Sequence, residues 1–422
     1  MYFSLAIVIA ALPFLVSASP LRSVSSDASR QSTSSGTKIS IYRRDDFFTG
    51  GDGLINKDAM QGQIEDSMAK MQRGFEAFQR NTGKRHPSDM GNLLHARKIG
   101  HDSLTDFSNV LWYGTIQVGT PPQNYTVDFD TGSSDLFLPG PTCNTNCAGH
   151  KAYNPSRSST SKDAHRTFQL SYGDGSSVQG EQYSDSVIIQ GLASKNQRLG
   201  AATQYSTGFS KSRFPPDGLL GLAFQEISEY NAPPVFASFV QQAQTTQAVF
   251  TFRLTSSQGS ELELGSSSMA GNAVTYTPVT QQGYWQVNMQ SVLANGKKAL
   301  GQISAIIDSG TTYIIGDDAN VRKLYASVPG AKDASMTVGQ GYYTVPCNAV
   351  PTISLTFGGK SFAISPSILN LGRVSSGSND CVAALVSSGI ATDFWIVGDI
   401  FMRNVNTVFD YGNKRVGFSP LK

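Results

Sequence analysis

From residue 112 onward, short stretches of alternating apolar and polar residues are separated by Gly, Pro and Asn. This two-residue period, interrupted by turn formers, predicts β-strands. Clear examples are Gly114–Val118, Tyr125–Phe129, Phe168–Tyr172 and Val249–Leu254. Within the same region, residues 234–244 and 320–328 favour helices. We therefore expect an all-β body with a few short helices.

A different pattern precedes this body. Apolar residues recur every three or four positions at Met60, Ile64, Met68, Met71, Phe75 and Phe78. That spacing predicts one α-helix with a single apolar face. No other segment between residues 19 and 101 can cover the face, so the helix should pack on the body. The alternative is a small independent helical domain.

The first 18 residues resemble a secretory signal peptide. The apolar run Leu5–Val16 leads into Val16-Ser17-Ala18, which fits a cleavage site of small residues, although no Lys or Arg precedes the run. A run of this length is too short to span a bilayer. Secretion is expected, and the alternative is a buried N-terminal strand or helix.

Composition and charge exclude several classes of protein. With 39% hydrophobic and 15% charged residues, the chain is too apolar to be disordered. A net charge of +2 gives no general means of binding nucleic acid. Residues 19–101 nevertheless carry +4 and residues 102–422 carry −2. A basic segment before an acidic body suggests a propeptide held partly by charge, with Lys84-Arg85 and Arg97-Lys98 as candidate processing sites.

The chain has four cysteines, and an even count after a signal peptide fits disulfides. Cys143 and Cys147 are close enough in sequence for a small loop to be the simplest pairing, which leaves Cys347 with Cys381. Four cysteines allow three connectivities. A zinc site is the competing interpretation, but the second pair is widely spaced and no His lies near it.

An internal repeat becomes visible when the chain is compared with itself. Val127-Asp-Phe-Asp130-Thr-Gly-Ser-Ser134 resembles Ala305-Ile-Ile-Asp308-Ser-Gly-Thr-Thr312. Each motif is followed later in the chain by two apolar residues and a glycine, which is Gly221 in the first case and Gly398 in the second. The distance from Asp130 to Gly221 and the distance from Asp308 to Gly398 differ by one residue. Either motif alone would be an ordinary turn. The duplication indicates two similar lobes.

The repeat suggests acid–base chemistry. An Asp that ends a strand and enters a Gly turn can present its carboxylate to a cleft, and the neighbouring hydroxyls can fix its plane. Two such carboxylates, brought together by an approximate twofold axis, would share a proton because like charges at close range cannot both ionise. One can then act as general base and the other as general acid on a water molecule.

The order of the motifs resembles that of pepsin-like aspartic endopeptidases, and secreted fungal members in particular. The resemblance covers residues 104 to 422. The matching stretches are Trp112-Tyr-Gly-Thr-Ile116, Val118-Gly-Thr-Pro-Pro122, Asp130-Thr-Gly-Ser-Ser-Asp-Leu136, Tyr172-Gly-Asp-Gly-Ser176, Asp217-Gly-Leu-Leu-Gly-Leu222, Gly283-Tyr-Trp-Gln286, Asp308-Ser-Gly-Thr311, Trp395-Ile-Val-Gly-Asp399 and Val408-Phe-Asp410.

This resemblance implies a bilobal pepsin-like acid protease fold with two lobes related by a pseudo-twofold axis. We expect a signal peptide over residues 1–18, a propeptide over 19–101, an N-terminal lobe over 102–275 and a C-terminal lobe over 276–422.

The resemblance also implies roles for single residues. Asp130 and Asp308 would be the catalytic pair that holds the attacking water. Support would come from Thr131, Gly132 and Ser133 in the first loop and Ser309, Gly310 and Thr311 in the second. Tyr172, Gly173 and Asp174 would form the tip of a flap over the peptide. The expected disulfides are Cys143–Cys147 and Cys347–Cys381, Asn124 is a glycosylation sequon in an expected turn, and no metal or other cofactor is implied.

One position departs from the family pattern. The residue after Asp135-Leu136 is usually Trp, whose indole can hydrogen-bond the flap tyrosine, but here it is Phe137. The hydroxyl of Tyr172 would then be held by other means. Three further motif residues, Asp135, Asp217 and Asp399, are interpreted as structural.

The expected activity is hydrolysis of peptide bonds between large apolar residues at acid pH, by an enzyme made as a zymogen. Its partners would be peptide or protein substrates and its own propeptide, without nucleic acid and without membrane attachment after signal removal. A monomer that is secreted is expected, with the vacuole as the alternative. Basic groups such as Lys84 or Arg85 could block the cleft until carboxylates are protonated.

Two other functions stay open. A catalytically silent member of the fold could bind peptides, although such a protein would usually have lost an Asp or a Gly from one motif. A two-carboxylate glycosidase is the second possibility, but it does not explain the repeat.

Overall fold

The computed structural model describes residues 36–43, 53–60, 62–89, 91, 111–171, 177–256, 259–271 and 273–421. By its contacts Ser34–Lys422 forms one unit, and the other unit, Met1–Thr33, lies outside the described residues. The expected signal peptide and the pair Arg97-Lys98 are outside them as well. Among the helices that the structure describes, none is long and apolar enough to cross a membrane.

One sheet holds most of the strands that precede residue 222. Its strands are β2 Tyr42–Arg43, β3 Trp112–Val118, β4 Gln123–Asp130, β5 Leu136–Pro139, β6 Lys162–Ser171, β7 Ser177–Ile189, β8 Leu192–Tyr205 and β9 Gly218–Gly221. Their spatial order is β2-β3-β4-β9-β5-β8-β7-β6. The strands expected from alternation near residues 114–118, 125–129 and 168–172 are β3, β4 and β6, each somewhat longer than predicted.

A second sheet joins both halves of the chain. Its strands are β1 Thr37–Ser40, β10 Val249–Arg253, β11 Glu261–Leu264, β12 Thr275–Gln281, β13 Gln286–Met289, β16 Ile303–Ile307, β17 Ile314–Gly316, β24 Leu385–Ser387, β25 Phe394–Val397, β26 Val405–Asp410 and β27 Arg415–Pro420. They follow the order β1-β11-β10-β26-β27-β12-β13-β16-β25-β17-β24. A strand from the expected propeptide therefore forms one edge of this sheet.

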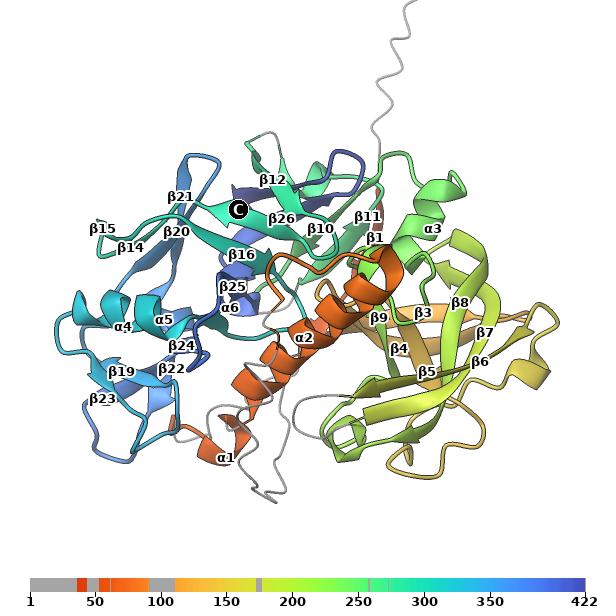
Figure 1. The fold of residues 1–422 in the computed structure, drawn as a ribbon, viewed down its shortest axis with the longest axis horizontal. Coiled ribbons are helices and arrows are strands. Elements are labelled where there is room, and N and C mark those ends of the chain that lie inside the picture. The colour runs from red at the N-terminus through yellow and green to blue at the C-terminus, as the bar shows by residue number, and fades with distance from the viewer. Residues whose placement is uncertain are drawn as a thin grey trace, which may run out of the picture. The chain divides into compact units, whose positions relative to one another are not determined.

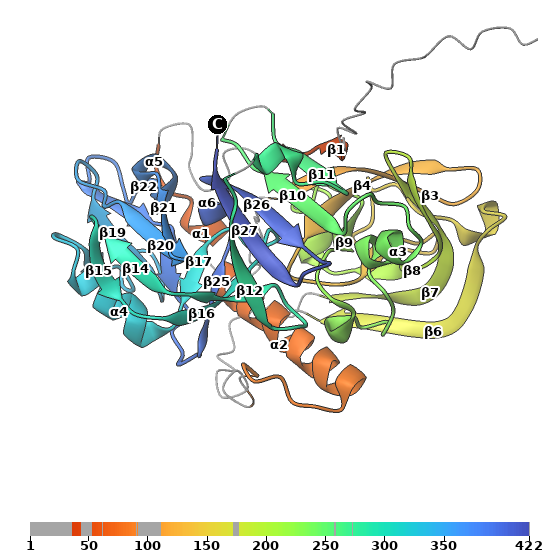
Figure 2. The same cartoon turned by 90° about the horizontal axis from the view of Figure 1, so that it is seen from above.

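Two small sheets complete the second half of the chain. One contains β14 Ser291–Ala294, β15 Lys297–Leu300, β20 Ile353–Phe357 and β21 Lys360–Ile364, and the other contains β18 Lys332–Asp333, β19 Tyr343–Pro346, β22 Asn370–Arg373 and β23 Asp380–Ala383. Figures 1 and 2 show these sheets on one side of the central strands and the strands β4–β8 on the other. The fold is the mostly β, bilobal arrangement expected from the sequence.

Helices are short apart from α2. They are α1 Lys57–Met60, α2 Gln63–Thr82, α3 Val235–Gln241, α4 Asp318–Ala326, α5 Pro366–Leu369 and α6 Asp399–Met402, with 3₁₀ turns η3 Pro155–Arg157, η4 Thr207–Phe209, η5 Gln225–Ile227 and η6 Ser268–Ala270. The predicted long helix is confirmed as α2. Gly62 is left-handed with φ 85° and separates Met60 from it, and left-handed Gly83 ends it by donating its N–H to Gln79 O.

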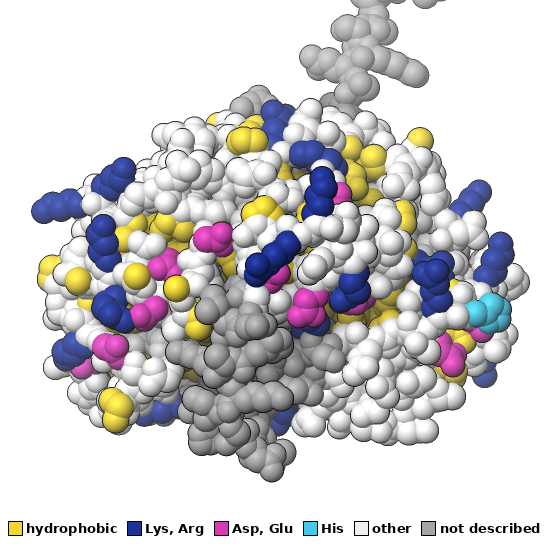
Figure 3. All heavy atoms as spheres, viewed as in Figure 1, with side chains coloured by type: hydrophobic (Ala, Val, Ile, Leu, Met, Phe, Trp, Pro, Cys, Tyr) yellow, Lys and Arg dark blue, Asp and Glu magenta, His cyan; other side chains and the backbone are white. Residues whose placement is uncertain are grey.

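The apolar face of α2 packs on the body, which argues against an independent helical domain. Ile64, Met68, Met71, Phe75 and Phe78 are all buried. The ring of Phe75 meets those of Tyr284 and Phe394 edge-on, with centroids 5.4 and 5.6 Å apart. In Figure 3, basic and acidic side chains lie side by side over the region that α2 occupies in Figure 1.

The sequence repeat corresponds to a repeated strand pairing. In the first half, β4 runs parallel to β9, with Asp130 opposite Gly221. In the second half, β16 runs parallel to β25, with Ile307 opposite Val397. In each case the two apolar residues before the glycine lie in the strand beside the one that leads to the Asp loop. The repeat therefore corresponds to the pair of parallel strands that positions each Asp loop.

Covalent and polar links stabilise the core around this framework. Cys143–Cys147 and Cys347–Cys381 form the two disulfides expected from the sequence. The fully buried indole of Trp112 donates its N–H to Asp399 Oδ2 at 3.0 Å, 287 residues further along the chain. This hydrogen bond connects the two halves of the chain.

Candidate active site

Asp130 and Asp308 occupy equivalent places in the two halves. Asp130 is the last residue of β4, and Asp308 directly follows β16. Their exposed fractions are 1% and 0%. Burial of two carboxyl groups is costly unless hydrogen bonds or opposite charges compensate for it. The surrounding contacts therefore decide whether this arrangement is stable.

Each carboxyl group is held by its own loop in the same way. Asp130 accepts hydrogen bonds from Gly132 N at 2.8 Å and Ser133 Oγ at 2.6 Å. Asp308 accepts them from Gly310 N at 3.0 Å and from Thr311 Oγ1 at 2.6 Å. One backbone donor and one hydroxyl donor thus fix the plane of each carboxyl group.

The two glycines allow each loop to approach the opposite carboxyl group. A Cβ added at Gly132 would lie 2.4 Å from Asp308 Oδ1, and one added at Gly310 would lie 2.2 Å from Asp130 Oδ1. Real Cβ atoms do not approach other atoms so closely. Glycine is required here for space, and the same geometry shows that the two carboxyl groups face each other.

Below the carboxyl groups, Thr131 and Ser309 bind the two loops to each other. Thr131 N donates to Ser309 Oγ at 3.0 Å, and Ser309 N donates to Thr131 Oγ1 at 2.8 Å. The Thr131 hydroxyl donates to Ile307 O, and the Ser309 hydroxyl to Phe129 O. Every polar atom of the two side chains is used, so the relative position of the loops is firmly determined.

Lys70 of α2 lies between the two carboxyl groups. Its Nζ is 3.1 Å from Asp130 Oδ1 and 2.7 Å from Asp308 Oδ2, and only 10% of its side chain is exposed. The sequence suggested Lys84 or Arg85 for such a contact, and that expectation is wrong. Lys84 is exposed, and Arg85 pairs instead with Asp89, four residues along its own segment.

The three groups shift one another's pKa. Burial lowers the pKa of Lys70, but the charges of Asp130 and Asp308 outweigh it and raise that pKa overall. Burial raises the pKa of Asp130, but the nearby Lys70 and the Ser133 hydroxyl bring it below its ordinary value. The pKa of Asp308 is raised to about 6 by burial and by the charge of Asp130, despite Lys70. The pair therefore favours one ionised and one protonated carboxyl group in mild acid.

Lys70 was missed because only the folded chain brings it to the carboxyl groups. A sequence signal did exist one turn later, at Gly74 in the middle of α2. A Cβ at Gly74 would lie 1.7 Å from Tyr284 Oη, and that hydroxyl donates to Met71 O at 2.8 Å. A glycine inside a helix often marks a close approach of this kind.

The other residues singled out from the sequence are placed as follows. Asp135 accepts hydrogen bonds from Ser228 Oγ, Glu229 N and Tyr230 N. Asp217 accepts them from Thr126 N and Lys151 N. These contacts fit the interpretation of both residues as structural. Asn124 is exposed, but it lies in β4 and not in a turn, because the strand begins one residue earlier. Its glycosylation stays a prediction.

The predicted flap tip cannot be described in the same way. Tyr172, Gly173 and Asp174 lie outside the described residues, and their role stays a prediction. The strands on either side, β6 and β7, pair antiparallel up to Ser171 and Ser177.

Phe137, which stands where the family usually has Trp, is fully buried, and its ring meets those of Tyr205 and Phe209 edge-on.

Comparison with known proteins gives the family. Residues 111–421 match the model for eukaryotic aspartyl proteases. The chain is 43% identical to an aspartic protease of Phaffia rhodozyma over 343 residues, which are 79% of this chain and 82% of that protein. This chain belongs to the eukaryotic aspartyl protease family. It is also 31% identical to pepsin A of Bos taurus over 87% of this chain and 98% of that protein.

A third relative is cathepsin D of Dictyostelium discoideum, 33% identical over 82% of this chain and 92% of that protein. The protein is therefore an aspartic endopeptidase. Both Asp motifs lie inside the matched region. Among the residues that the structure describes, no group of three or more His, Cys, Asp or Glu side chains could hold a metal ion.

Proposed function

We propose that Asp130 and Asp308 are the catalytic pair of a secreted, acid-acting aspartic endopeptidase that is made as a zymogen. A water molecule bound between them loses a proton to the ionised carboxylate and attacks the peptide carbonyl carbon. The protonated carboxyl group gives its proton to the carbonyl oxygen. Collapse of the resulting diol breaks the C–N bond: the protonated carboxyl group gives its proton to the leaving nitrogen, and the ionised carboxylate takes a proton from one hydroxyl of the diol.

One observation carries this proposal: the two buried carboxyl groups face each other, and hydrogen bonds between Thr131 and Ser309 hold their loops together. Each accepts a backbone N–H and a hydroxyl from its own loop. These hydrogen bonds keep the two carboxyl groups in position while charge develops on the substrate. Because the attacking group is water, the reaction needs no covalent intermediate. The opposite pKa shifts of the two groups support a division into base and acid, although they titrate as a pair.

Residues 19–101 are proposed as the propeptide, and α2 as its inhibitory element. Lys70 occupies the space between the carboxyl groups, where the catalytic water would bind. The C-terminal end of α2 is fixed as well, because Asn81 Nδ2 donates to Glu226 O and Ser228 O at 3.1 and 2.7 Å. Cleavage of this segment would open the cleft between the lobes 102–275 and 276–422.

Acid should release the helix. Lys70 lowers the proton affinity of both carboxyl groups, so the docked state binds protons less readily than the open state. Docking is therefore strongest at neutral pH and weakens as pH falls through the range in which the carboxyl groups protonate. The mature enzyme would work under the same acid conditions.

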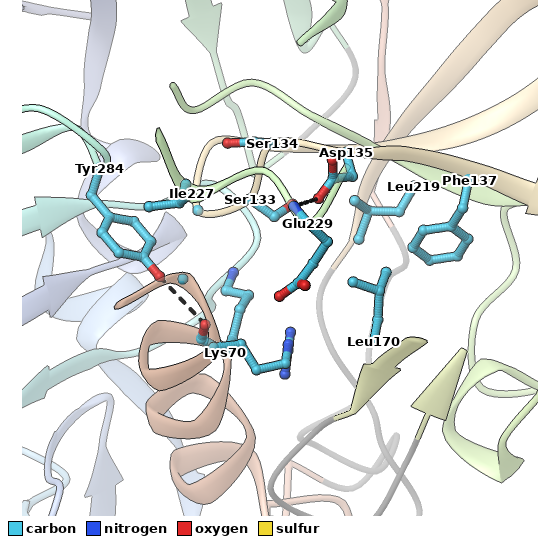
Figure 4. Close-up of a pocket in the computed structure, with 13 residues that line it drawn as sticks. Lys70, Ser133, Ser134, Asp135, Phe137, Leu170, Leu219, Ile227, Glu229 and Tyr284 are labelled. Carbon is cyan, nitrogen blue, oxygen red and sulfur yellow. Dashed lines mark hydrogen bonds between the residues drawn. The ribbon is translucent and has the colours of Figure 1, made fainter. Parts of the chain in front are cut away.

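The proposed substrates are peptides or proteins with large apolar residues at the cleaved bond. Phe137, Leu170, Leu219 and Ile227 supply apolar walls to the pocket beside the Asp130 loop (Figure 4). An extended peptide would bind there mainly through its main chain. The apolar leader at residues 1–18 supports secretion, and we propose that the mature enzyme acts as a monomer.

The decisive experiment is incubation of the purified precursor at acid pH, followed by N-terminal sequencing and digestion of a peptide library. The wild-type precursor should lose residues up to about position 101 and then cleave apolar peptides. Asp130→Asn and Asp308→Asn should both fold and remain inactive. Substantial hydrolysis by either variant would refute the proposed mechanism, whereas an inactive but peptide-binding wild type would favour a silent member of the family.

A further inference from the structure

A second acidic side chain, Glu229, lines the pocket beside the Asp130 loop (Figure 4). Gly132, Ser133 and Tyr284 line the same pocket, and the Ser133 hydroxyl is the one that binds Asp130. The pocket is therefore next to the reacting carboxyl groups. Only 19% of the Glu229 side chain is exposed. A carboxylate at this depth requires a positive partner.

In the precursor, α2 supplies that partner. Arg80 Nη2 lies 2.5 Å from Glu229 Oε2. Arg73 lies about two turns earlier on the helix and lines the same pocket. Burial raises the pKa of Glu229, and the charges of Arg80 and Arg73 partly offset this rise. Both arginines lie within the proposed propeptide, so its removal takes away both cations while the carboxylate remains in the cleft.

The backbone that carries Glu229 is held by the body and not by the propeptide alone. Glu229 N donates to Asp135 Oδ2 at 2.7 Å, and Ser228 Oγ donates to Asp135 Oδ1 at 2.6 Å. The next residue, Tyr230, donates its hydroxyl to Leu136 O at 3.2 Å. The carboxylate should therefore keep its position after the helix has left.

We propose that Glu229 is a specificity-determining residue, which makes this pocket in the mature enzyme accept a Lys or Arg side chain of the substrate. In the precursor, Arg73 lines this pocket and Arg80 pairs with Glu229, so α2 supplies the positive charge that a substrate's basic side chain would bring. The apolar walls from Phe137, Leu219 and Ile227 suit the methylene stem of such a residue, whose cationic end reaches Glu229. This inference depends on the proposed protease function and refines its substrate class.

The preference should depend on pH. The charged groups that face Glu229 are Arg73, Arg80 and Glu76 on α2 and Asp135 below the loop. Burial raises the pKa of Glu229, and the two arginines counteract this only while α2 is docked. Without α2 the pKa of Glu229 rises further above its ordinary value, so the pair with a basic substrate residue forms only where this carboxyl group is ionised. Preference for a basic residue should therefore increase with pH and vanish as Glu229 becomes protonated.

The test uses mature enzyme and peptide pairs that differ only in having Lys or Leu at one position, moved through each position around the cleaved bond. At one position, Glu229→Gln should lower the Lys/Leu ratio of kcat/KM about tenfold, and the loss should be largest at the highest pH that supports activity. Glu226→Gln is the matched control. It removes a charge from the same loop, but Glu226 Oε1 faces Gln282 and does not line the pocket.

The outcomes separate this inference from the proposed function. A wild type that cleaves the Leu peptides, with the same Lys/Leu ratio in Glu229→Gln at every position and pH, overturns the inference alone. An equal loss of both substrates also overturns it, because that would be a structural effect. Failure of the wild type to cleave any peptide after acid activation overturns the proposed function as well. Partial recovery of the ratio in Glu229→Asp would support the inference.

Discussion

The Nζ of Lys70 lies 2.7 Å from Asp308 Oδ2, so an amino group from the N-terminal segment touches a carboxyl group of the body. The two residues are far apart in the sequence, and Lys70 lies in the segment that we propose as the propeptide. If one partner of a buried ion pair is removed, the other charge stays buried without compensation, which is strongly destabilising. The contact therefore couples the position of α2 to the charge of the proposed catalytic pair.

Replacing Lys70 with Met should weaken the docking of α2. Met keeps the apolar stem but leaves the two carboxyl groups without a cation, and breaking a buried pair costs about 3–5 kcal/mol. The precursor should open and process itself at a higher pH than the wild type. The pH of half-maximal activation, followed by gel electrophoresis, measures the shift. Lys57→Met is the control, because Lys57 is exposed and lies outside both dibasic pairs. An unchanged midpoint in Lys70→Met would exclude Lys70 as the inhibitory group.

His86 should contribute a second pH response. It is 1% exposed, its ring stacks on that of Phe75 at 4.5 Å, and burial lowers its pKa to about 4, although Asp89 acts in the other direction. The docked state therefore prefers neutral His86. Its stabilising effect is complete above pH 6.5, the ordinary value, and is lost as pH falls from there through about 4.

His86→Asn tests this response. An Asn can still accept the hydrogen bond that Ser88 N donates to His86 Nδ1, but it does not titrate. We expect activation to require a lower pH and to be less steep than in the wild type. Hydrogen exchange of the α2 amides at several pH values would measure the docking directly. Identical pH profiles for the two proteins would show that His86 has no part in activation.

Gly132→Ala should reduce activity in the mature enzyme far more than it reduces stability. The added methyl group would meet Asp308 Oδ1 at 2.4 Å and push the two loops apart. A displacement of about 1 Å can cost roughly 100-fold in rate. Steady-state kcat/KM on an apolar peptide gives the effect. Gly301→Ala, where a Cβ would meet nothing within 4 Å, should be neutral; equal activity in the two variants would contradict the steric argument.

Thr131→Val should destabilise the protein by about 1–3 kcal/mol. Valine has the same shape, but it removes the oxygen that accepts from Ser309 N and the hydroxyl that donates to Ile307 O. A buried N–H and a buried carbonyl would lose their partners. The melting temperature, measured at neutral pH to prevent self-digestion, should fall by several degrees. A melting temperature equal to that of the wild type would mean that water replaces both bonds.

The Asp loops were predictable because each is encoded locally and then repeated. The strand that ends at Asp130, the following glycine and the hydroxyl at Ser133 are adjacent in sequence, and so are their counterparts around Asp308. The later apolar pairs were recognised only as part of the repeat, and the structure shows that they lie in β9 and β25, which pair with β4 and β16. Periodicity likewise predicted the long helix, because its buried face follows directly from the helical repeat.

Contacts between distant segments were not predictable in the same way. The sequence suggested that a basic group would enter the cleft, but it could not select Lys70 over Lys84, because the choice depends on where α2 packs. Arg80 and Glu229 are 149 residues apart, and neither lies in a recognisable motif. Such pairs follow from the tertiary arrangement and have no local signature.

The strand β1 lies in the proposed propeptide and forms part of a sheet of the body. Thr37–Ser40 pair with Glu261–Leu264 and form one end of the eleven-stranded sheet. If the N-terminal segment departs, the backbone N–H and C=O groups on that side of β11 lose their partners, and an open sheet edge attracts other strands. If the proposed propeptide is removed, we therefore expect either another part of the mature chain to fill the place of β1 or concentrated enzyme to self-associate along this edge.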